Sequence, residues 1–191
     1  SFVPEEKRLG NVLITGSTGF LGAHVLDEYL KAEDGIAYCL VRGNEGRLTD
    51  VLKYYFDDAY LHLIGSRIIP LVGDITDEDL YSILPDNIQT IIHTAASVKH
   101  YGSYKYFEDI NVNGTKNVID CAKKSGAKMV HVSTLSISGN SLAEEFAVYR
   151  NSEHIEFKEG NLFVNQPLEN VYIHSKFEAE VAVLEAMLEG F

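Results

Sequence analysis

Five short apolar runs alternate with stretches of helical periodicity along the chain. The strand-like runs lie at 11–15, 36–41, 67–72, 89–94 and 128–133. The helical stretches lie at about 20–32, 47–63, 77–84, 104–125 and 172–189. None of the strand-like runs has an alternating polar face, which is typical of a parallel sheet covered by helices on both faces. The alternation therefore predicts β-α-β units and an α/β fold with a doubly wound parallel sheet.

The 191 residues are enough for one domain with a sizeable core. Helical periodicity breaks at about 139–170, which predicts a long polar insert before the last helix. After that helix the chain ends at Glu189-Gly190-Phe191, where a further strand would be expected. We therefore expect residues 1–191 to form a single, incomplete domain.

Composition excludes several classes of function. The net charge of −12 argues against nucleic acid or an anionic membrane as partner, since both need a basic surface. No apolar run approaches the roughly 18–20 residues of a membrane span, and the N-terminus is no signal peptide. Cys39 and Cys121 lie in buried-type patterns, so free thiols are expected rather than a disulfide. The seven histidines show no metal-like spacing, so no metal site is expected, and the compartment is predicted to be the cytoplasm.

A glycine triplet joins the first strand to the first helix. Gly16, Gly19 and Gly22 have G-x-x-G-x-x-G spacing. Gly16 would allow a tight turn, Gly19 would let the backbone approach a pyrophosphate, and Gly22 would let the helix pack close to the strand. The helix N-terminus would offer unpaired N–H groups to the phosphates. In this context the triplet predicts a Rossmann-type dinucleotide site, whereas alone it is compatible with a turn that binds nothing.

The end of the second strand indicates which dinucleotide is bound. An NAD-preferring site has an acidic side chain about 20 residues beyond the first glycine. This chain has Arg42 in the corresponding stretch, CLVRGNEG. A guanidinium suits a 2′-phosphate, so NADP is favoured, with Arg47 as a weaker second candidate. The alternative for Arg42 is a solvated arginine at a strand end.

The ends of later strands carry residues suited to lining a cofactor cleft. Asp74 is a candidate acceptor for the adenine amino group, or equally an N-terminal helix cap. Ile75 is a candidate to pack on the adenine ring. Ala95 and Ala96 are small enough to let a nucleotide pass close to the backbone.

A hydroxyl pair, a tyrosine and a lysine form the candidate catalytic set. Ser133 and Thr134 follow the fifth strand, and Tyr172 and Lys176 lie four residues apart on the last helix. Residues with that spacing share one helix face, and a nearby cation favours phenolate, which would make the tyrosine a usable acid. Thr134 would stabilise the oxyanion that forms as hydride arrives. Taken alone, the Tyr–Lys pair is compatible with an exposed surface pair.

These motifs occur in the order found in extended short-chain dehydrogenases/reductases. The motifs are VLITGSTGFLG, GDIT, HTAAS, INVNGTKNVI, HVSTLSISG and YIHSK. Within that family the chain most resembles the thioester reductase branch. This branch includes terminal reductase domains of nonribosomal peptide synthetases, carboxylic acid reductases, aminoadipate reductases and fatty acyl-CoA reductases. The residues that carry the branch are YCLVRG, the RL…YYF region and STLSISG.

The resemblance implies roles for individual residues. The implied catalytic residues are Thr134, Tyr172 and Lys176. Asn111 matches an asparagine with a structural or proton-relay role. The implied cofactor-binding residues are Gly16, Ser17, Thr18, Gly19, Phe20, Leu21, Gly22, Arg42, Asp74, Ile75, Ala95 and Ala96, with Lys176 reaching the nicotinamide ribose.

The resemblance also implies a function and a partner. The implied substrate is an acyl or peptidyl group held as a thioester on the phosphopantetheine arm of a carrier-protein domain in the same polypeptide. NADPH would reduce the thioester and release that group as an aldehyde, or as an alcohol after a second hydride. A smaller C-terminal substrate lobe is expected after residue 191. The alternatives are a carboxylic acid or fatty acyl-CoA reductase, an NAD(P)-dependent sugar epimerase or dehydratase, a steroid-type dehydrogenase, and a dinucleotide-sensing regulatory domain without catalysis.

Overall fold

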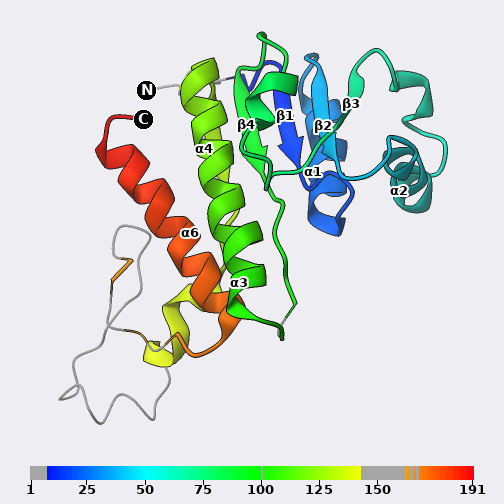
Figure 1. Cartoon of the computed structure of the whole chain (residues 1–191). Coiled ribbons are helices and arrows are strands. Elements are labelled where there is room, and N and C mark those ends of the chain that lie inside the picture. Colours follow the sequence, from blue (N-terminus) through cyan, green and yellow to red (C-terminus); the bar gives the residue numbers. More distant parts are fainter. Residues whose placement is uncertain (1–7, 100, 143–161, 164–165, 167) are drawn as a thin grey trace, which may run out of the picture. The chain divides into compact units, whose positions relative to one another are not determined.

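The computed structural model describes residues 8–99, 101–142, 162–163, 166 and 168–191 (Figure 1). Most of the predicted polar insert lies outside the described residues. The chain divides into two compact units, which are described separately. The first unit comprises Ser1–Ala96 and Gly114–Val132, and the second comprises Ser97–Asn113 and Ser133–Phe191.

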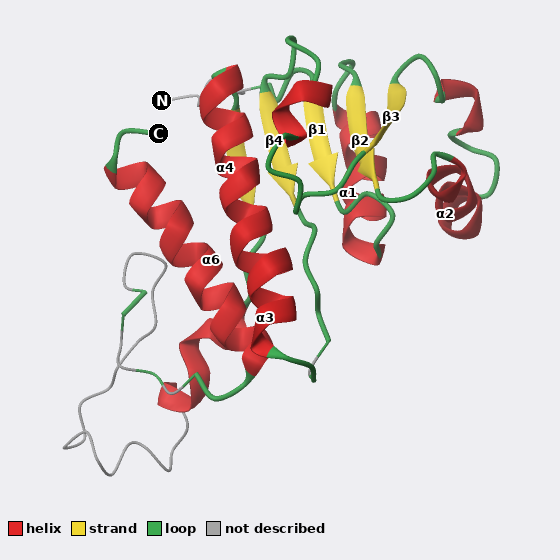
Figure 2. Cartoon of the chain, viewed as in Figure 1, coloured by secondary structure: helices red, strands yellow, loops and turns green. Residues whose placement is uncertain are grey.

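A five-stranded parallel sheet forms the centre of the first unit (Figure 2). Its strands are β1 (Val12–Thr15), β2 (Ala37–Val41), β3 (Ile68–Val72), β4 (Thr90–His93) and β5 (Lys128–His131). Their spatial order is β3-β2-β1-β4-β5. The order reverses between β1 and β4, and in open α/β sheets ligands bind beyond the carboxyl ends of strands at such a point. The predicted α/β fold with a doubly wound parallel sheet is confirmed.

Apolar residues on both faces of β1 and β2 build the core of the first unit. Every residue of both strands is buried, as the lack of an alternating polar face predicts. On one side these strands pack against Leu26 of α1 (Phe20–Ala32) and Leu48 of α2 (Gly46–Phe56). Cys39 and Cys121 are free and buried, as expected, and burial raises the pKa of the Cys39 thiol to about 12.

Two predicted helices of the first unit are shorter than their apolar patterns suggest. The helix expected at 47–63 ends at Phe56, because Asp57 has φ +52° and cannot continue it, and a 3-10 turn η1 (Leu61–Leu63) follows. The helix expected at 77–84 is reduced to a 3-10 turn η2 (Leu80–Ile83). There the carboxylate of Asp77 accepts the N–H of Asp79, a local bond that competes with helix formation.

The stretch expected to be one helix at 104–125 is divided into three parts. In the second unit, α3 (Tyr104–Phe107) leads into a π-helical turn, η3 (Glu108–Asn113). The chain then enters α4 (Gly114–Ser125), which belongs to the first unit and packs on β4 and β5. Apolar periodicity did not reveal the π turn, which changes the hydrogen-bonding step without interrupting the helical pattern.

The second unit also contains η4 (Leu135–Leu142) and the long helix α6 (Val171–Leu188). Asn170 caps α6: its side-chain oxygen accepts the N–H groups of Tyr172 and Ile173 at 2.9 and 3.2 Å. This cap fixes where the helix starts, and therefore where its first turn places Tyr172. Helix α6 packs against α3, η3 and η4.

Candidate active site

The glycine turn of the first unit leaves no room for a larger residue at Gly16 or Gly22. Gly16 has φ +76°, and a Cβ there would lie 2.7 Å from the backbone nitrogen of Ala95. A Cβ on Gly22 would lie 2.2 Å from the carbonyl oxygen of Gly16. The N–H of Gly19 donates to that same carbonyl at 2.9 Å, which closes the turn. The strand-turn-helix geometry is the one that the glycine spacing predicts.

The turn leads directly into the N-terminus of α1. Gly19 is the N-cap residue, no side chain caps this end within the described residues, and the first turn has no acidic residue. Phe20 and Leu21 are exposed at this end, with Phe20 67% exposed. Such an end presents N–H groups and the positive pole of the helix, so it fits an anionic group such as a pyrophosphate.

Ser17 is placed differently from its neighbours in the turn. Its side chain is fully buried, and the hydroxyl donates to the carbonyl of Leu40 at 3.3 Å. The hydroxyl thus ties the turn to β2, and any contact of Ser17 with a phosphate would come from its backbone N–H. The side chain of Thr18 is partly exposed.

A network of hydrogen-bonded polar side chains holds the strand ends next to the glycine turn. The ring of His93 lies between two hydroxyls, with Nδ1 2.7 Å from Oγ1 of Thr15 and Nε2 3.0 Å from Oγ1 of Thr115. Thr94 donates its hydroxyl to the carbonyl of Thr15 at 2.7 Å. These bonds join the carboxyl ends of β1 and β4. Neither His93 nor these threonines was identified from the sequence as part of the site.

We expect Gly22→Ala to destabilise the first unit by about 3 kcal/mol or more, because its Cβ would collide with backbone rather than with a flexible side chain. Gly19→Ala is the matched control: its φ is −91° and its Cβ would lie 3.3 Å from the oxygen of Gly16, so the loss should be much smaller. Urea denaturation of both variants measures the difference. Equal losses would show that the close packing of Gly22 is not what the fold requires.

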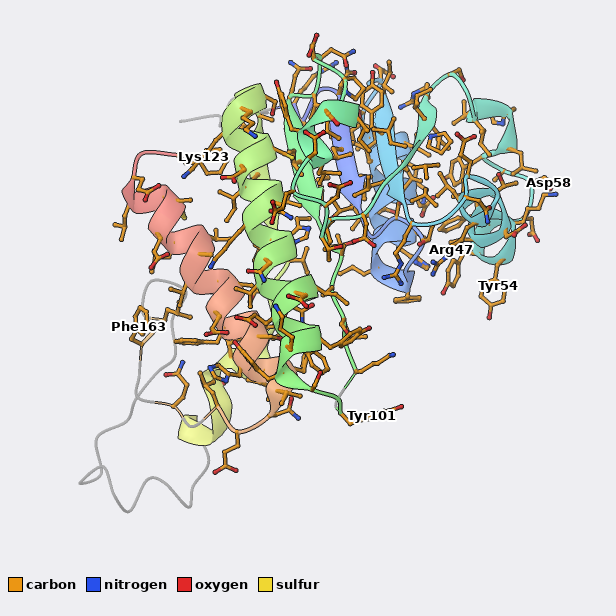
Figure 3. The ribbon with its side chains drawn as sticks, viewed as in Figure 1. Arg47, Tyr54, Asp58, Tyr101, Lys123 and Phe163 are labelled. Atoms are coloured by element: carbon orange, nitrogen blue, oxygen red, sulfur yellow. The ribbon has the colours of Figure 1, made fainter. Side chains whose placement is uncertain are left out.

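The two arginines considered for a 2′-phosphate are both exposed near the carboxyl end of β2. Arg42, 66% exposed at its side chain, has Nη1 3.9 Å from Oδ2 of Asp74. A pair this long and this exposed is weak, so Arg42 is available to a stronger anionic ligand. Arg47 lies in the first turn of α2 (Figure 3), where its N–H donates to the side chain of Asn44 at 3.2 Å.

Asp74 and Ile75 form a fixed turn after β3. The carboxylate of Asp74 accepts both the N–H and the hydroxyl of Thr76 at 3.0 Å, a local turn rather than the helix cap considered from the sequence. Ile75 is 6% exposed and packs tightly against Gly114. A Cβ added to Gly114 would lie 2.7 Å from Cδ1 of Ile75. The side-chain nitrogen of Asn117 donates to the carbonyl of Ile75 at 2.9 Å. Asn117 was not identified from the sequence.

Ala95 and Ala96 are partly exposed at the end of β4. The N–H of Ala95 donates to Oγ1 of Thr15 at 3.3 Å, which holds its backbone beside the glycine turn. The first unit therefore brings the glycine turn and the two alanines together, while Arg42 follows the neighbouring strand β2 and Arg47 lies in the first turn of α2.

In the second unit, Tyr172 and Lys176 lie one turn apart on α6, as their spacing predicts. Tyr172 is partly exposed, whereas Lys176 is only 3% exposed. Burial lowers the pKa of Lys176 to about 8, while the negative charge of Glu180 acts in the opposite direction. A buried lysine is unfavourable for folding, so its presence on this helix favours a functional pair over an exposed surface pair.

The hydroxyls of Ser133 and Thr134 have different partners. Ser133 donates to the carboxylate of Glu180 on α6. Oγ1 of Thr134 accepts the N–H of Ser136 at 3.3 Å. Because the hydroxyl is the acceptor in this bond, its own hydrogen is not used there and can be donated to a substrate. The hydroxyl of Ser133 is therefore used in a bond to α6, whereas that of Thr134 is not bonded to this helix in the contacts described. Glu180 was not identified from the sequence.

Asn111 organises the first turn of α6. Its side-chain oxygen accepts the N–H of Ser97 at 2.7 Å, and its side-chain nitrogen donates to the carbonyl of Ser97 at 3.0 Å and to the hydroxyl of Ser175 at 2.9 Å. Ser175 in turn donates to the carbonyl of Tyr172 at 2.8 Å. Both amide hydrogens of Asn111 are therefore used, which favours the structural role over the proton relay. Ser97 and Ser175 were not identified from the sequence.

Across the described residues, no group of three or more His, Cys, Asp or Glu side chains is arranged to hold a metal ion. None of the helices in the described part of the chain combines the length and apolar character needed to cross a membrane.

Comparison with known proteins shows clear relatives. Residues 14–191 match the family described as "Male sterility protein" (NAD_binding_4). A solved thiolation-reductase di-domain from an archaeal non-ribosomal peptide synthetase is 42% identical, with a TM-score of 0.84 over 96% of this chain and 40% of that one. The reductase domain of the aureusimine biosynthetic cluster is 33% identical, with a TM-score of 0.78 over 97% of this chain and 47% of that one. A linear gramicidin synthase polypeptide of Brevibacillus parabrevis is 33% identical over 93% of this chain and 4% of that protein.

The chain spans less than half of each of these relatives. The matches confirm the predicted resemblance to terminal reductase domains of peptide synthetases.

Proposed function

Because the chain belongs to the Male sterility protein (NAD_binding_4) family of NAD(P)-binding reductases, we propose that the complete protein is an NADPH-dependent thioester reductase. It releases an acyl or peptidyl group from the phosphopantetheine arm of a carrier-protein domain as an aldehyde. The observation that carries this proposal is the pairing of Tyr172 with the buried Lys176 on α6. The similarity to a solved di-domain in which a thiolation domain accompanies the reductase supports the choice of a carrier-bound substrate.

The cofactor proposal follows from the first unit. The glycine turn and the N-terminus of α1 would hold the pyrophosphate, because they combine close backbone approach with free N–H groups. Arg42 and Arg47 would bind a 2′-phosphate, for which we propose NADPH rather than NADH. When bound, the cofactor supplies the hydride.

The residues of the second unit would stabilise the negative charge that develops on the substrate oxygen and supply the proton that neutralises it. As hydride reaches the carbonyl carbon, the π bond opens and negative charge develops on the oxygen. Thr134 and Tyr172 would donate hydrogen bonds to that oxygen, and the phenol of Tyr172 would then supply its proton. With a pKa of about 8, Lys176 remains mostly a cation at neutral pH and stabilises the phenolate left behind.

The product of this step is a hemithioacetal. Its hydroxyl proton is lost as the C–S bond breaks, so the sulfur leaves as the free thiol of the phosphopantetheine arm and the carbon becomes an aldehyde. One hydride and one proton are consumed overall. A second round of the same chemistry would convert the aldehyde into an alcohol.

An assay with the full-length protein tests the proposal. We expect thioester-dependent oxidation of NADPH, with stoichiometric release of thiol and aldehyde. Parallel reactions with a carrier-bound thioester and a coenzyme A thioester separate the proposed substrate from that of an acyl-CoA reductase. Oxidation of a nucleotide-sugar or steroid substrate instead, or dinucleotide binding without any turnover, would reject the proposal.

The same assay tests the cofactor when NADH replaces NADPH. Arg42→Ala should reduce the preference for NADPH by raising its KM, because the guanidinium would contact only the 2′-phosphate. Binding of both dinucleotides, measured by calorimetry, provides a check that does not depend on turnover. A preference unchanged in Arg42→Ala would assign the 2′-phosphate to another group.

A further inference from the structure

Glu180 continues the row of residues that begins with Tyr172 and Lys176. The three residues are spaced four apart on α6, so they lie on one helix face. The carboxylate of Glu180 accepts the hydroxyl of Ser133, the residue next to Thr134. The row thus connects the candidate acid and the buried cation to a carboxylate whose position is fixed from a second segment of the chain.

The burial of Lys176 gives this carboxylate an electrostatic role. Lys176 as a residue is only 3% exposed, and burial disfavours the charged form of its side chain. The charge of Glu180 opposes this effect by raising the pKa of Lys176. Removing the carboxylate should therefore lower the pKa of Lys176 further, because the effect of burial would no longer be opposed by the charge of Glu180.

Several other charged or titratable side chains of α6, α3 and η3 have partners of their own. Tyr104 of α3 donates to Glu178 of α6, whose second oxygen lies 3.9 Å from Nε2 of His174. Lys105 of α3 pairs with Asp109 and Glu108 in η3. Each of these side chains thus has a named partner other than Lys176.

We propose that Glu180 is a positioning residue: its carboxylate, held by Ser133, keeps the buried Lys176 in the charged form that Tyr172 needs. The electrostatic part concerns only the second unit and stands without a substrate. The consequence for catalysis rests on the proposed function. Ser133 acts through Glu180, and Thr134 retains its own role toward the substrate oxygen.

The experiment is to measure the titration of Lys176 directly in Glu180→Gln. Competitive labelling of the full-length protein with acetic anhydride across a pH range of about 6–11, followed by mass spectrometry of the peptide that contains Lys176, gives the titration midpoint. Glutamine keeps the size of the side chain and can still accept from Ser133, so the fold should be retained. We expect the midpoint to fall by about one pH unit, a tenfold change in the proton dissociation constant.

Three further variants separate charge from structure. Glu185→Gln removes an exposed carboxylate from the same helix and should leave the midpoint unchanged. Glu180→Asp keeps the charge and should restore most of the wild-type midpoint. Ser133→Ala releases the carboxylate and should lower the midpoint by a smaller amount, which tests the proposal even if Glu180→Gln fails to fold. A midpoint that stays at its wild-type value in both Glu180→Gln and Ser133→Ala would overturn the proposal.

The pH profile of kcat supplies the second readout. If the charged lysine is the active form, activity falls as pH rises through the pKa of Lys176. Glu180→Gln should move this alkaline limb to lower pH by the same amount as the labelling midpoint. Absence of thioester reduction in the wild-type protein would remove the proposed function and leave the labelling result standing, so the two failures are distinguishable.

Discussion

Tyr172→Phe in the full-length protein should reduce thioester reduction by about 10²–10⁴-fold, the usual contribution of a positioned general acid. The substitution removes only the phenolic oxygen. It therefore deletes the proton donor and one hydrogen bond to the developing oxyanion, while the ring still fills the same space. The backbone contacts of Tyr172 to Asn170 and Ser175 do not involve the phenol and should hold the first turn of α6 in place. Single-turnover rates of NADPH oxidation measure the loss, and calorimetry should show unchanged affinity for NADPH.

Tyr101→Phe is the matched control for this experiment. Tyr101 belongs to the same unit and is 80% exposed (Figure 3), so loss of its hydroxyl should leave the rate unchanged. A rate in Tyr172→Phe close to the wild-type rate would show that another group supplies the proton. A parallel loss of NADPH affinity would instead assign the phenol to cofactor binding.

The sheet and the glycine turn could be predicted because their signals are local. The apolar runs and the spacing of Gly16, Gly19 and Gly22 can each be recognised within a few consecutive residues. The predicted alternation of strands and helices also appears in the structure, with the strand order that places β1 beside β4. What the periodicity did not predict is the π turn at Glu108–Asn113, since a change in hydrogen-bonding step leaves the apolar spacing nearly intact.

The partners of polar side chains could not be predicted, because they lie far apart in the sequence. Ser133 meets Glu180 across 47 residues, and Asn111 meets Ser175 across 64. A serine or an asparagine carries no local sign of such a partner. Arg42 and Asp74 show the same limit of prediction from sequence. They were considered separately, yet Nη1 of Arg42 lies 3.9 Å from Oδ2 of Asp74. Their roles toward the dinucleotide remain predictions.

Lys176→Met should stabilise the folded protein and, under the proposed function, lower its activity by about a hundredfold or more. The ordinary pKa of lysine is 10.5, and burial lowers that of Lys176 to about 8. The unfolded chain therefore holds this proton more tightly than the folded one. Below about pH 8 both states are charged, and the folded state carries the full penalty of the buried charge. Between about pH 8 and 10.5 the folded state has released the proton while the unfolded state still binds it, so stability rises with pH.

The size of this effect follows from the two pKa values. A change from 10.5 to about 8, at about 1.4 kcal/mol per pH unit, corresponds to about 3 kcal/mol at neutral pH. Methionine has similar length and carries no charge, so it should recover about 1–3 kcal/mol of that penalty. Part of the gain is lost because Glu180 no longer faces a cation, although its bond from Ser133 remains.

Urea denaturation at about pH 7 and about pH 9.5, with hydrogen-exchange mass spectrometry of α6 peptides, distinguishes this cause from simple repacking. The stability of the wild-type protein should include a contribution from Lys176 that grows between the two pH values. Lys176→Met should lack that contribution and should exceed the wild type mainly at neutral pH. Lys116→Met, at an exposed position of α4, is the matched control and should follow the wild-type pH dependence.

The opposite result would change how the lysine is explained. If Lys176→Met were less stable than the wild type at neutral pH, the ammonium would contribute net stabilising interactions within the second unit. Its retention would then be explained by the fold. The functional assignment would in that case depend on Tyr172 alone, because a buried lysine that stabilises its surroundings needs no catalytic role to account for its position.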